Sequence, residues 1–306
     1  MLLAGLILQN LVLLALIAGL FLARRPTRRW RTIYTVSAAT VMLGLLLSGV
    51  WVYPPSWGAA IYLALFLFAC IRWWRMPVAK DGKAGPLKVL LVALTAIPGA
   101  ILVWQGVAGR IAPAQEPILL ASPFAERDGH CVLSGGSSLA LNLHYVESEK
   151  TAASYEKHSV DFIRVNPFGF RTAPSRSLSP KPGSLSDYAV YGSSVVAPCD
   201  GTVIVAEDGK PDVAPGHANR SLDGSNYVLL QCRKADILLA HFQPGTVSVS
   251  EGDTVVTGTP LGLVGNSGNT EEPHLHINAQ KRAPDGSQAA VPMRFDGRYL
   301  ARGNCL

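Results

Sequence analysis

Residues 252–276 read GDTVVTGTPLGLVGNSGNTEEPHLH. Short apolar runs in this stretch alternate with glycine, asparagine and proline, which is typical of brief β-strands joined by tight turns. The stretch ends on His274-Leu275-His276. In a strand, residues two apart point to the same face, so the two imidazoles are expected side by side while Leu275 faces the core. Paired imidazoles can bind a metal ion, or one can bind while the other transfers protons.

The same pattern extends over most of the chain after Arg110. Strands are expected in the runs 137–146, 159–165, 193–206, 226–232, 237–242, 254–256, 260–264 and 274–279. No helical pattern intervenes between them, which predicts an all-β domain. Two long polar segments, 166–187 and 208–225, are expected to be loops.

The first third of the chain has a different character. Residues 32–71 contain no charged side chain, which is very hard to place in a water-soluble domain. A helix needs about 20 apolar residues to cross a bilayer. Four spans are therefore predicted, over residues 2–23, 33–52, 57–71 and 89–109. The expected organisation is a four-helix transmembrane anchor over residues 1–110 and an all-β domain over residues 111–306.

A pair of adjacent prolines and a single proline add detail to these spans. Pro54 and Pro55 predict a tight turn between the second and third spans, because proline ends a helix at or just before itself. Pro98 predicts a kink inside the fourth span.

Charge predicts how the spans are oriented. The first 110 residues hold eleven Lys/Arg and one acidic residue, a net charge of +10, and the remainder has a net charge of −4. The basic residues gather after the first span and after the third: Arg24, Arg25, Arg28, Arg29 and Arg31, then Arg72, Arg75, Lys80, Lys83 and Lys88. Because such loops stay cytoplasmic, the C-terminal domain is expected on the outer face of the cell membrane, periplasmic or extracellular. The lipid bilayer is the partner of the spans, and the acidic balance outside them argues against nucleic-acid binding.

Cysteine usage agrees with an exported domain. Four of the five cysteines follow residue 110: Cys131, Cys199, Cys232 and Cys305. In an oxidising compartment they permit two disulfides with three possible pairings, and the spacing does not choose among these.

Three segments of the β-rich region together resemble the lysostaphin/LytM-type zinc metallopeptidases, which cut the peptide part of bacterial cell walls. Residues 251–276 resemble that family's V-x-x-G-D-x-V-x-x-G-x-x-I-G-x-V-G-x-S-G stretch followed by P-H-L-H. Residues 191–203, YGSSVVAPCDGTV, look like its G-x-P-V-x-A-P-x-D-G-x-V, and LAHF at 239–242 looks like its Y-A-H-L. The resemblance covers residues 137–279 and implies a LytM-like antiparallel sheet.

The resemblance also implies a Zn²⁺ site with a catalytic pair beside it. His276 would be a zinc ligand, and His241 and His274 would be the catalytic histidines that do not bind the metal. Asp161 matches the family's aspartate ligand. The remaining ligand in the family is a histidine four residues before that aspartate, where this chain has Lys157.

Two histidines are candidates for the displaced ligand. His158 lies three residues before Asp161, on the opposite face of an extended strand. His144 is preferred, because a hairpin of 137–146 with 159–165 would let it converge with Asp161. The predicted zinc ligands are therefore His144, Asp161 and His276.

The sequence also indicates where three further residues are expected to lie. Asn142 shares the predicted strand face of His144 and would either orient a ligand or substrate or serve the fold. His130 and His217 lack any such context and are expected at the surface.

The sequence therefore predicts a membrane-anchored zinc metalloendopeptidase acting on peptidoglycan cross-links or stems, or on another peptide. The displaced ligand keeps a second hypothesis open, in which a catalytically degenerate domain serves as a cell-wall binding or regulatory module with an unidentified protein partner. A lipoyl- or biotinyl-type carrier is rejected, because no lysine to be modified lies between Lys234 and Lys281.

Overall fold

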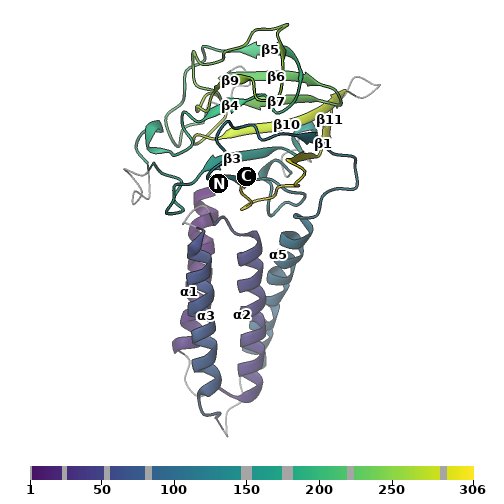
Figure 1. The fold of residues 1–306 in the computed structure, drawn as a ribbon. Coiled ribbons are helices and arrows are strands. Elements are labelled where there is room, and N and C mark those ends of the chain that lie inside the picture. The colour runs from purple at the N-terminus through teal and green to yellow at the C-terminus, as the bar shows by residue number, and fades with distance from the viewer. Residues whose placement is uncertain are drawn as a thin grey trace. The chain divides into compact units, whose positions relative to one another are not determined.

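The computed structural model describes residues 2–22, 26–51, 56–79, 85–145, 154–173, 182–218, 224–282 and 288–306. The chain divides into two compact units, Met1–Ala108 and Gly109–Leu306 (Figure 1).

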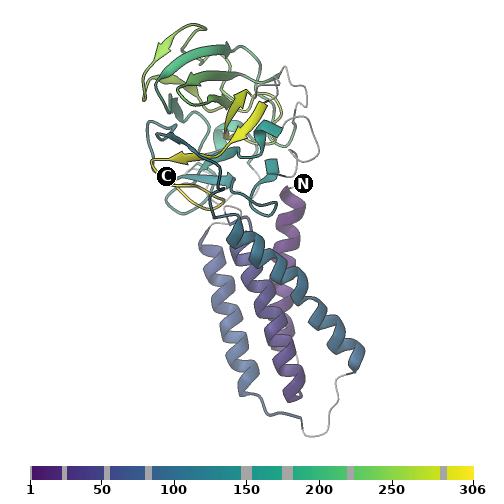
Figure 2. The same cartoon turned by 90° about the vertical axis from the view of Figure 1, so that its right-hand side faces the viewer.

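The first unit is helical. Its described residues form α1 (Leu2–Leu22), α2 (Arg28–Ser48), α3 (Trp57–Arg75), α4 (Pro86–Leu94) and α5 (Ala96–Ala108). By length and composition, four segments could cross a membrane: most of α1, then α2, α3, and α4 together with α5. Within the unit, α1 packs on α3 and α2 on α5, with the helices running alongside one another (Figures 1 and 2).

The second span begins earlier than the hydropathy pattern indicates. The side chain of Thr27 caps the helix, so α2 starts at Arg28 rather than at residue 33. The predicted bounds of 33–52 are therefore wrong at both ends. Arg31 is buried, and its guanidinium donates to two backbone carbonyls at the end of α3. These hydrogen bonds compensate part of the free energy that it costs to bury the guanidinium away from water.

The fourth span is interrupted at Thr95, between α4 and α5. Pro98, three residues later, has no N–H to donate to the carbonyl of Leu94, which accounts for a break at this point. Glycine lets α5 approach α2 closely, since a Cβ on Gly44 would lie 2.8 Å from the carbonyl oxygen of Gly99. The turn predicted at Pro54-Pro55 lies outside the described residues.

The second unit is built on an antiparallel sheet. Its strands lie in the spatial order β2 (His130–Ser134), β3 (Val160–Arg164), β10 (Leu275–Arg282), β7 (Asp236–Ala240), β6 (Tyr227–Cys232), β5 (Gly201–Glu207) and β8 (Thr254–Val255), and β11 (Gln288–Val291) also pairs with β10 (Figure 1). Two smaller pairs are β4 (Ser194–Val196) with β9 (Pro260–Leu263), and β1 (Ile118–Leu120) with β12 (Met293–Phe295). The predicted fold class, apolar helices followed by a LytM-like antiparallel sheet, is confirmed.

One apolar core lies against this sheet. Strand β10 shows how it is built: Leu275, Ile277 and Ala279 are buried in the core cluster, and the intervening residues lie on the opposite face. The disulfides are Cys131–Cys305, which ties the C-terminal tail to β2, and Cys199–Cys232, which joins β6 to the turn before β5. The structure thus selects one of the three pairings that the sequence allowed.

Residues 137–145, the described part of the strand expected over 137–146, do not form a strand, which corrects the predicted hairpin. Residues 136–141 form bends and turns, and 143–145 form a single helical turn. Gly136 has a φ of 112°, a conformation that interrupts a strand. The neighbour of β3 is instead β2, whose five residues are all buried. A strand buried on both faces lacks the alternation of polar and apolar residues by which strands are recognised.

His130, in β2, corrects a second expectation, because it is buried rather than at the surface. Its side chain is 1% exposed and stacks on Phe124 with ring centroids 3.7 Å apart. Neither ring nitrogen has a hydrogen-bond partner among the described residues. Burial, aided by the charge of Arg164, lowers the pKa of His130 to about 4. His217 is exposed, as expected.

We expect acid to destabilise the second unit partly through His130. Its pKa in the fold lies below the value of about 6.5 in an unfolded chain, so its contribution is complete above pH 6.5 and is lost as the pH falls towards 4. As the pH falls from about 7.5 to about 4.5, protonation of this imidazole in the unfolded chain should lower the unfolding free energy by about 2–3 kcal/mol. Denaturant unfolding of the full chain in detergent, followed by near-ultraviolet circular dichroism, measures the loss.

His130→Phe keeps a stacked ring without a titrating group, and should lose less stability over this pH interval than the wild type. The matched control is His217→Phe, at an exposed position. An equal acid loss in wild type and His130→Phe would contradict the assignment.

Candidate functional site

Three adjacent strands, β3, β10 and β7, position the central residues of the site. In the antiparallel register, His276 of β10 lies opposite Asp161 of β3 on one side and opposite Ala240 of β7 on the other. His241 follows Ala240 directly, and His274 precedes His276 by two residues on the same face. The sheet register therefore brings together four of the five residues that the sequence singled out.

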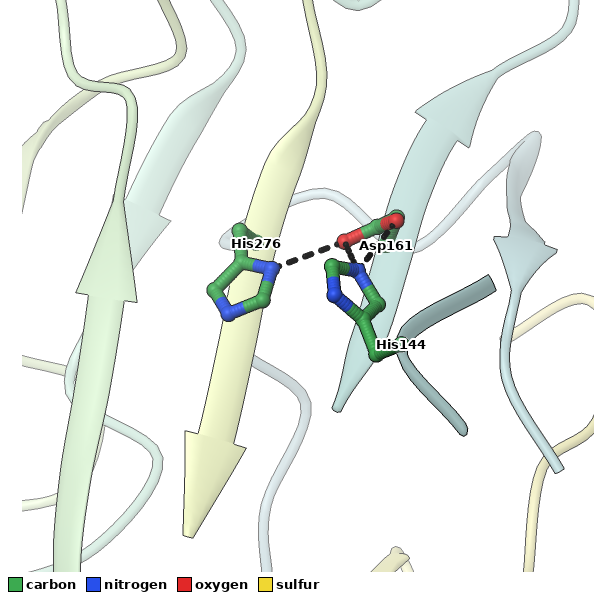
Figure 3. A group of neighbouring side chains, drawn as sticks. All are labelled: His144, Asp161 and His276. Atoms are coloured by element: carbon green, nitrogen blue, oxygen red, sulfur yellow. Dashed lines mark hydrogen bonds and ion pairs between the residues drawn. The ribbon is translucent and has the colours of Figure 1, made fainter. Parts of the chain in front are cut away.

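The fifth residue, His144, comes from the helical turn that follows β2. Its Nε2 lies 3.1 and 2.9 Å from the two carboxylate oxygens of Asp161 (Figure 3). On the other side, Nδ1 of His276 lies 2.9 Å from Oδ1 of the same carboxylate. One ligand atom from each of the three residues lies within 4.8 Å of the others. Such a group of two imidazoles and a carboxylate can hold a metal ion.

Asn142 explains how His144 reaches Asp161 without a hairpin. The Asn142 side chain is fully buried, and its Oδ1 accepts from the backbone N–H of His144 at 3.0 Å. Its Nδ2 donates to the carbonyls of Gly136, Lys157 and Ser159. Asn142 thus joins the segment that carries His144 to the residues that lead into β3, and it orients that segment from within the fold.

His241 has a strained backbone. Its φ of 73° lies in the left-handed region, which costs a residue other than glycine about 1 kcal/mol or more. Hydrogen bonds on both sides hold it, from its N–H to the carbonyl of Asn226 and from the N–H of Gly265 to its own carbonyl. The imidazole lies beside that of His274, with ring centroids 4.7 Å apart.

Backbone carbonyls set the tautomers of the His241–His274 pair. Nδ1 of His241 lies 2.7 Å from the carbonyl oxygen of Ser267, and Nδ1 of His274 lies 2.9 Å from that of Glu272. A carbonyl oxygen only accepts, so each Nδ1 carries the proton and each Nε2 has a free lone pair. Nε2 of His274 is 3.7 Å from Oδ1 of Asp161. Both basic nitrogens are therefore available for proton transfer.

Different interactions set the pKa of the Asp161 carboxyl group and the pKa values of the two histidines of this pair. Burial raises the pKa of Asp161, but the imidazoles of His144 and His274 outweigh it and hold that pKa well below its usual range. Burial lowers the pKa of His241 well below its usual value, and lowers that of His274 as well. The lowered pKa values keep the carboxylate of Asp161 ionised and the imidazoles of His241 and His274 neutral, and a neutral imidazole can accept a proton.

His158 lies apart from this cluster. It is half-buried and belongs, with Lys157, to a neighbouring hollow. Sequence reasoning missed the residues that hold the His241–His274 pair, which are Ser267, Glu272 and Asn226. Ser267 lies in the glycine-rich motif and was recognisable there, whereas the carbonyl of Glu272 and the role of Asn226 leave no mark in the sequence.

Residues 185–289 match peptidase family M23. The match includes His241, His274 and His276, and begins after His144 and Asp161. No curated protein matches the chain significantly.

Similar solved structures include a zinc-containing peptidase from Vibrio cholerae, at 17% identity and a TM-score of 0.25 over 48% of this chain and 30% of the other. Lysostaphin from Staphylococcus simulans is 20% identical, with a TM-score of 0.23 over 36% of this chain and 43% of its own. A complex of SpoIIIAH and SpoIIQ matches at 16% identity and a TM-score of 0.32, over 56% of this chain and 96% of the other. The chain thus spans less than half the length of the first two.

We expect Gly265→Ala to disturb the support of His241. A Cβ at Gly265 would lie 2.5 and 2.6 Å from backbone atoms of Gln243 and 2.7 Å from the carbonyl carbon of Phe242, and backbone cannot yield cheaply. The unfolding free energy should fall by about 1–3 kcal/mol, as for other overpacked sites. Urea unfolding of the full chain in detergent measures it.

Gly183→Ala is the matched control, because its Cβ would meet only Oδ2 of Asp187, at 3.9 Å. If both variants were as stable as the wild type, the close approach at Gly265 would not matter to the fold.

Proposed function

We propose that this chain, whose residues 185–289 match peptidase family M23, is a membrane-anchored zinc metalloendopeptidase. Its proposed substrates are the peptide bonds of peptidoglycan cross-links or stems. The observation that carries the proposal is the convergence of His144, Asp161 and His276 beside the histidine pair of His241 and His274.

The three proposed ligands fit zinc. Histidine nitrogen and carboxylate oxygen are ordinary zinc ligands, and three protein ligands leave a position for water or substrate, as in catalytic sites. The donors present here are Nε2 of His144, a carboxylate oxygen of Asp161 and Nδ1 of His276. Bound zinc supplies polarisation of the scissile carbonyl and lowers the pKa of water to about 7.

The histidine pair supplies the proton chemistry. A backbone carbonyl fixes each ring at Nδ1 and leaves Nε2 as the basic nitrogen, and Nε2 of His274 lies 3.7 Å from Oδ1 of Asp161. One Nε2 can take the proton of the attacking water, and a protonated Nε2 can then donate a hydrogen bond to the developing oxyanion. Both rings are little exposed, which strengthens these interactions by keeping bulk water away.

Three observations support an anchored domain on the outer face of a membrane. Four segments are long and apolar enough to span a bilayer. Basic residues cluster on the two connections that the positive-inside rule assigns to the cytoplasm. The second unit contains two disulfides, which persist in oxidising compartments.

The alternative function, a degenerate cell-wall binding or regulatory module, rested on Lys157 at the position of the family's first ligand. The contact of His144 with both oxygens of Asp161 supplies a replacement ligand from elsewhere in the chain. The donor set is therefore complete in number, which favours the enzyme over the module.

Zinc content tests the ligand assignment. The full chain, purified in detergent with zinc, should hold about one equivalent of the metal. His144→Ala or His276→Ala should remove most of it, because alanine offers no ligand atom in place of the lost imidazole. His158→Ala is the control and should keep its zinc. Atomic absorption gives the metal content, and release of new amino groups from isolated peptidoglycan gives the activity.

A folded wild-type chain that binds no zinc and cleaves no peptidoglycan would contradict the enzyme and support the binding or regulatory module. Zinc loss in His158→Ala, with zinc retained in His144→Ala, would reverse the ligand assignment.

His241→Asn should separate activity from stability. Asparagine adopts the left-handed conformation more readily than histidine, so the unfolding free energy should not decrease. Loss of the imidazole should lower the rate of peptide cleavage by about 10²–10⁴-fold, the usual contribution of a general acid–base group. Zinc content should stay at the wild-type level, and His217→Asn should change neither property. Full activity in His241→Asn would exclude a catalytic role.

A further inference from the structure

A hollow of about 620 Å³ adjoins the proposed zinc site in the second unit. Its volume falls in the range of pockets that hold small ligands. The side chains of its lining that enter the argument are those of Gln115, Ser137, Tyr145, Lys157, His158 and Gln288.

The hollow and the zinc site share a wall. His144 contacts Asp161, and the next residue, Tyr145, lines the hollow. On the facing segment, a carboxylate oxygen of Glu156 lies 3.9 Å from Nδ1 of His144, and the next residue, Lys157, lines the hollow. Since consecutive Cα atoms are about 3.8 Å apart, the residues that form the two sites are immediate neighbours on both segments.

The polar groups of the hollow suit an anion. No acidic side chain lines it, and the ammonium of Lys157 has no carboxylate partner among the described residues. That ammonium lies 4.5 Å from the ring centroid of Tyr145, which holds the lysine against an apolar surface. Nδ1 of His158 is buried and makes no hydrogen bond to a described residue. A cation and a ring nitrogen are thus both left for a ligand to satisfy.

The neutral side chains complete this surface. The amide of Gln115 donates to the carbonyl of Ala290 at 3.0 Å, so its position in the lining is fixed. Asn142 binds the carbonyl of Lys157, so the backbone of that residue is fixed as well. The lysine is therefore presented from a rigid segment, which favours specific recognition over loose attraction.

We propose that this hollow binds a carboxylate of the peptide substrate through Lys157 and His158, next to the zinc site. The inference rests on the proposed function, because it names the class of peptide that the same site takes: one with a free carboxylate close to the scissile bond. An ammonium and a carboxylate form a charge-assisted hydrogen bond, which is stronger than a bond between neutral groups.

Binding of N-acetyl-trialanine and of its C-terminal amide tests the inference. The full chain in detergent is stripped of zinc with EDTA, so that the carboxylate cannot bind to the metal, and Kd is measured by calorimetry. The wild type should bind the carboxylate about tenfold more tightly than the amide. Lys157→Gln should remove this preference and leave binding of the amide unchanged, and Lys157→Arg should retain part of it.

Lys234→Gln is the matched control, because it removes the same charge from an exposed lysine that pairs with Glu116 and does not line the hollow. Equal Kd values for the two peptides in the wild type, or a preference that survives in Lys157→Gln, would overturn the inference. Circular dichroism of each variant establishes that it is folded.

The outcome is independent of the test of activity. A chain that cleaves peptidoglycan without preferring the carboxylate would retain the proposed function and lose this inference. A chain that prefers the carboxylate but cleaves nothing would retain the binding pocket and lose the enzyme.

Discussion

The site depends on one buried carboxylate, that of Asp161. A carboxylate taken out of water is stable only where partners compensate its charge, and here imidazoles contact it from two sides. Those partners come from separate parts of the chain, the helical turn that carries His144 and the strand that carries His276. The carboxylate therefore joins three segments, so the residues of the proposed zinc site also hold these segments together.

The strained backbone at His241 shows a second constraint. A histidine in the left-handed region destabilises the fold locally, and the surrounding hydrogen bonds to Asn226 and Gly265 maintain it. The consequence is an imidazole turned out of its strand towards His274. The strain fixes the direction of the imidazole on which the proposed proton chemistry depends, and the packed glycine at 265 is part of the same arrangement.

Prediction succeeded where structure follows local periodicity. The spacing of His274 and His276 predicted that both imidazoles share a face, which holds although β10 begins only at Leu275, and uncharged length identified the apolar helices. It failed where burial removes the pattern. Strand β2 has no polar alternation because both of its faces are covered, and the same burial hides His130, whose residue type is usually found in contact with water.

The sequence by itself determined the apolar helices, the β-class of the second unit and the shared face of His274 and His276, because uncharged length identifies apolar helices and a period of two residues shows which side of a strand is apolar. Only the tertiary structure decided the disulfide pairing, the contact of His144 with Asp161, and the position of Lys157 and His158 in a separate hollow. These features depend on contacts between residues far apart in the chain, such as those that Asn142 makes across the start of β3. No periodicity encodes such contacts, because they arise from how whole elements pack and not from the order of residues within one.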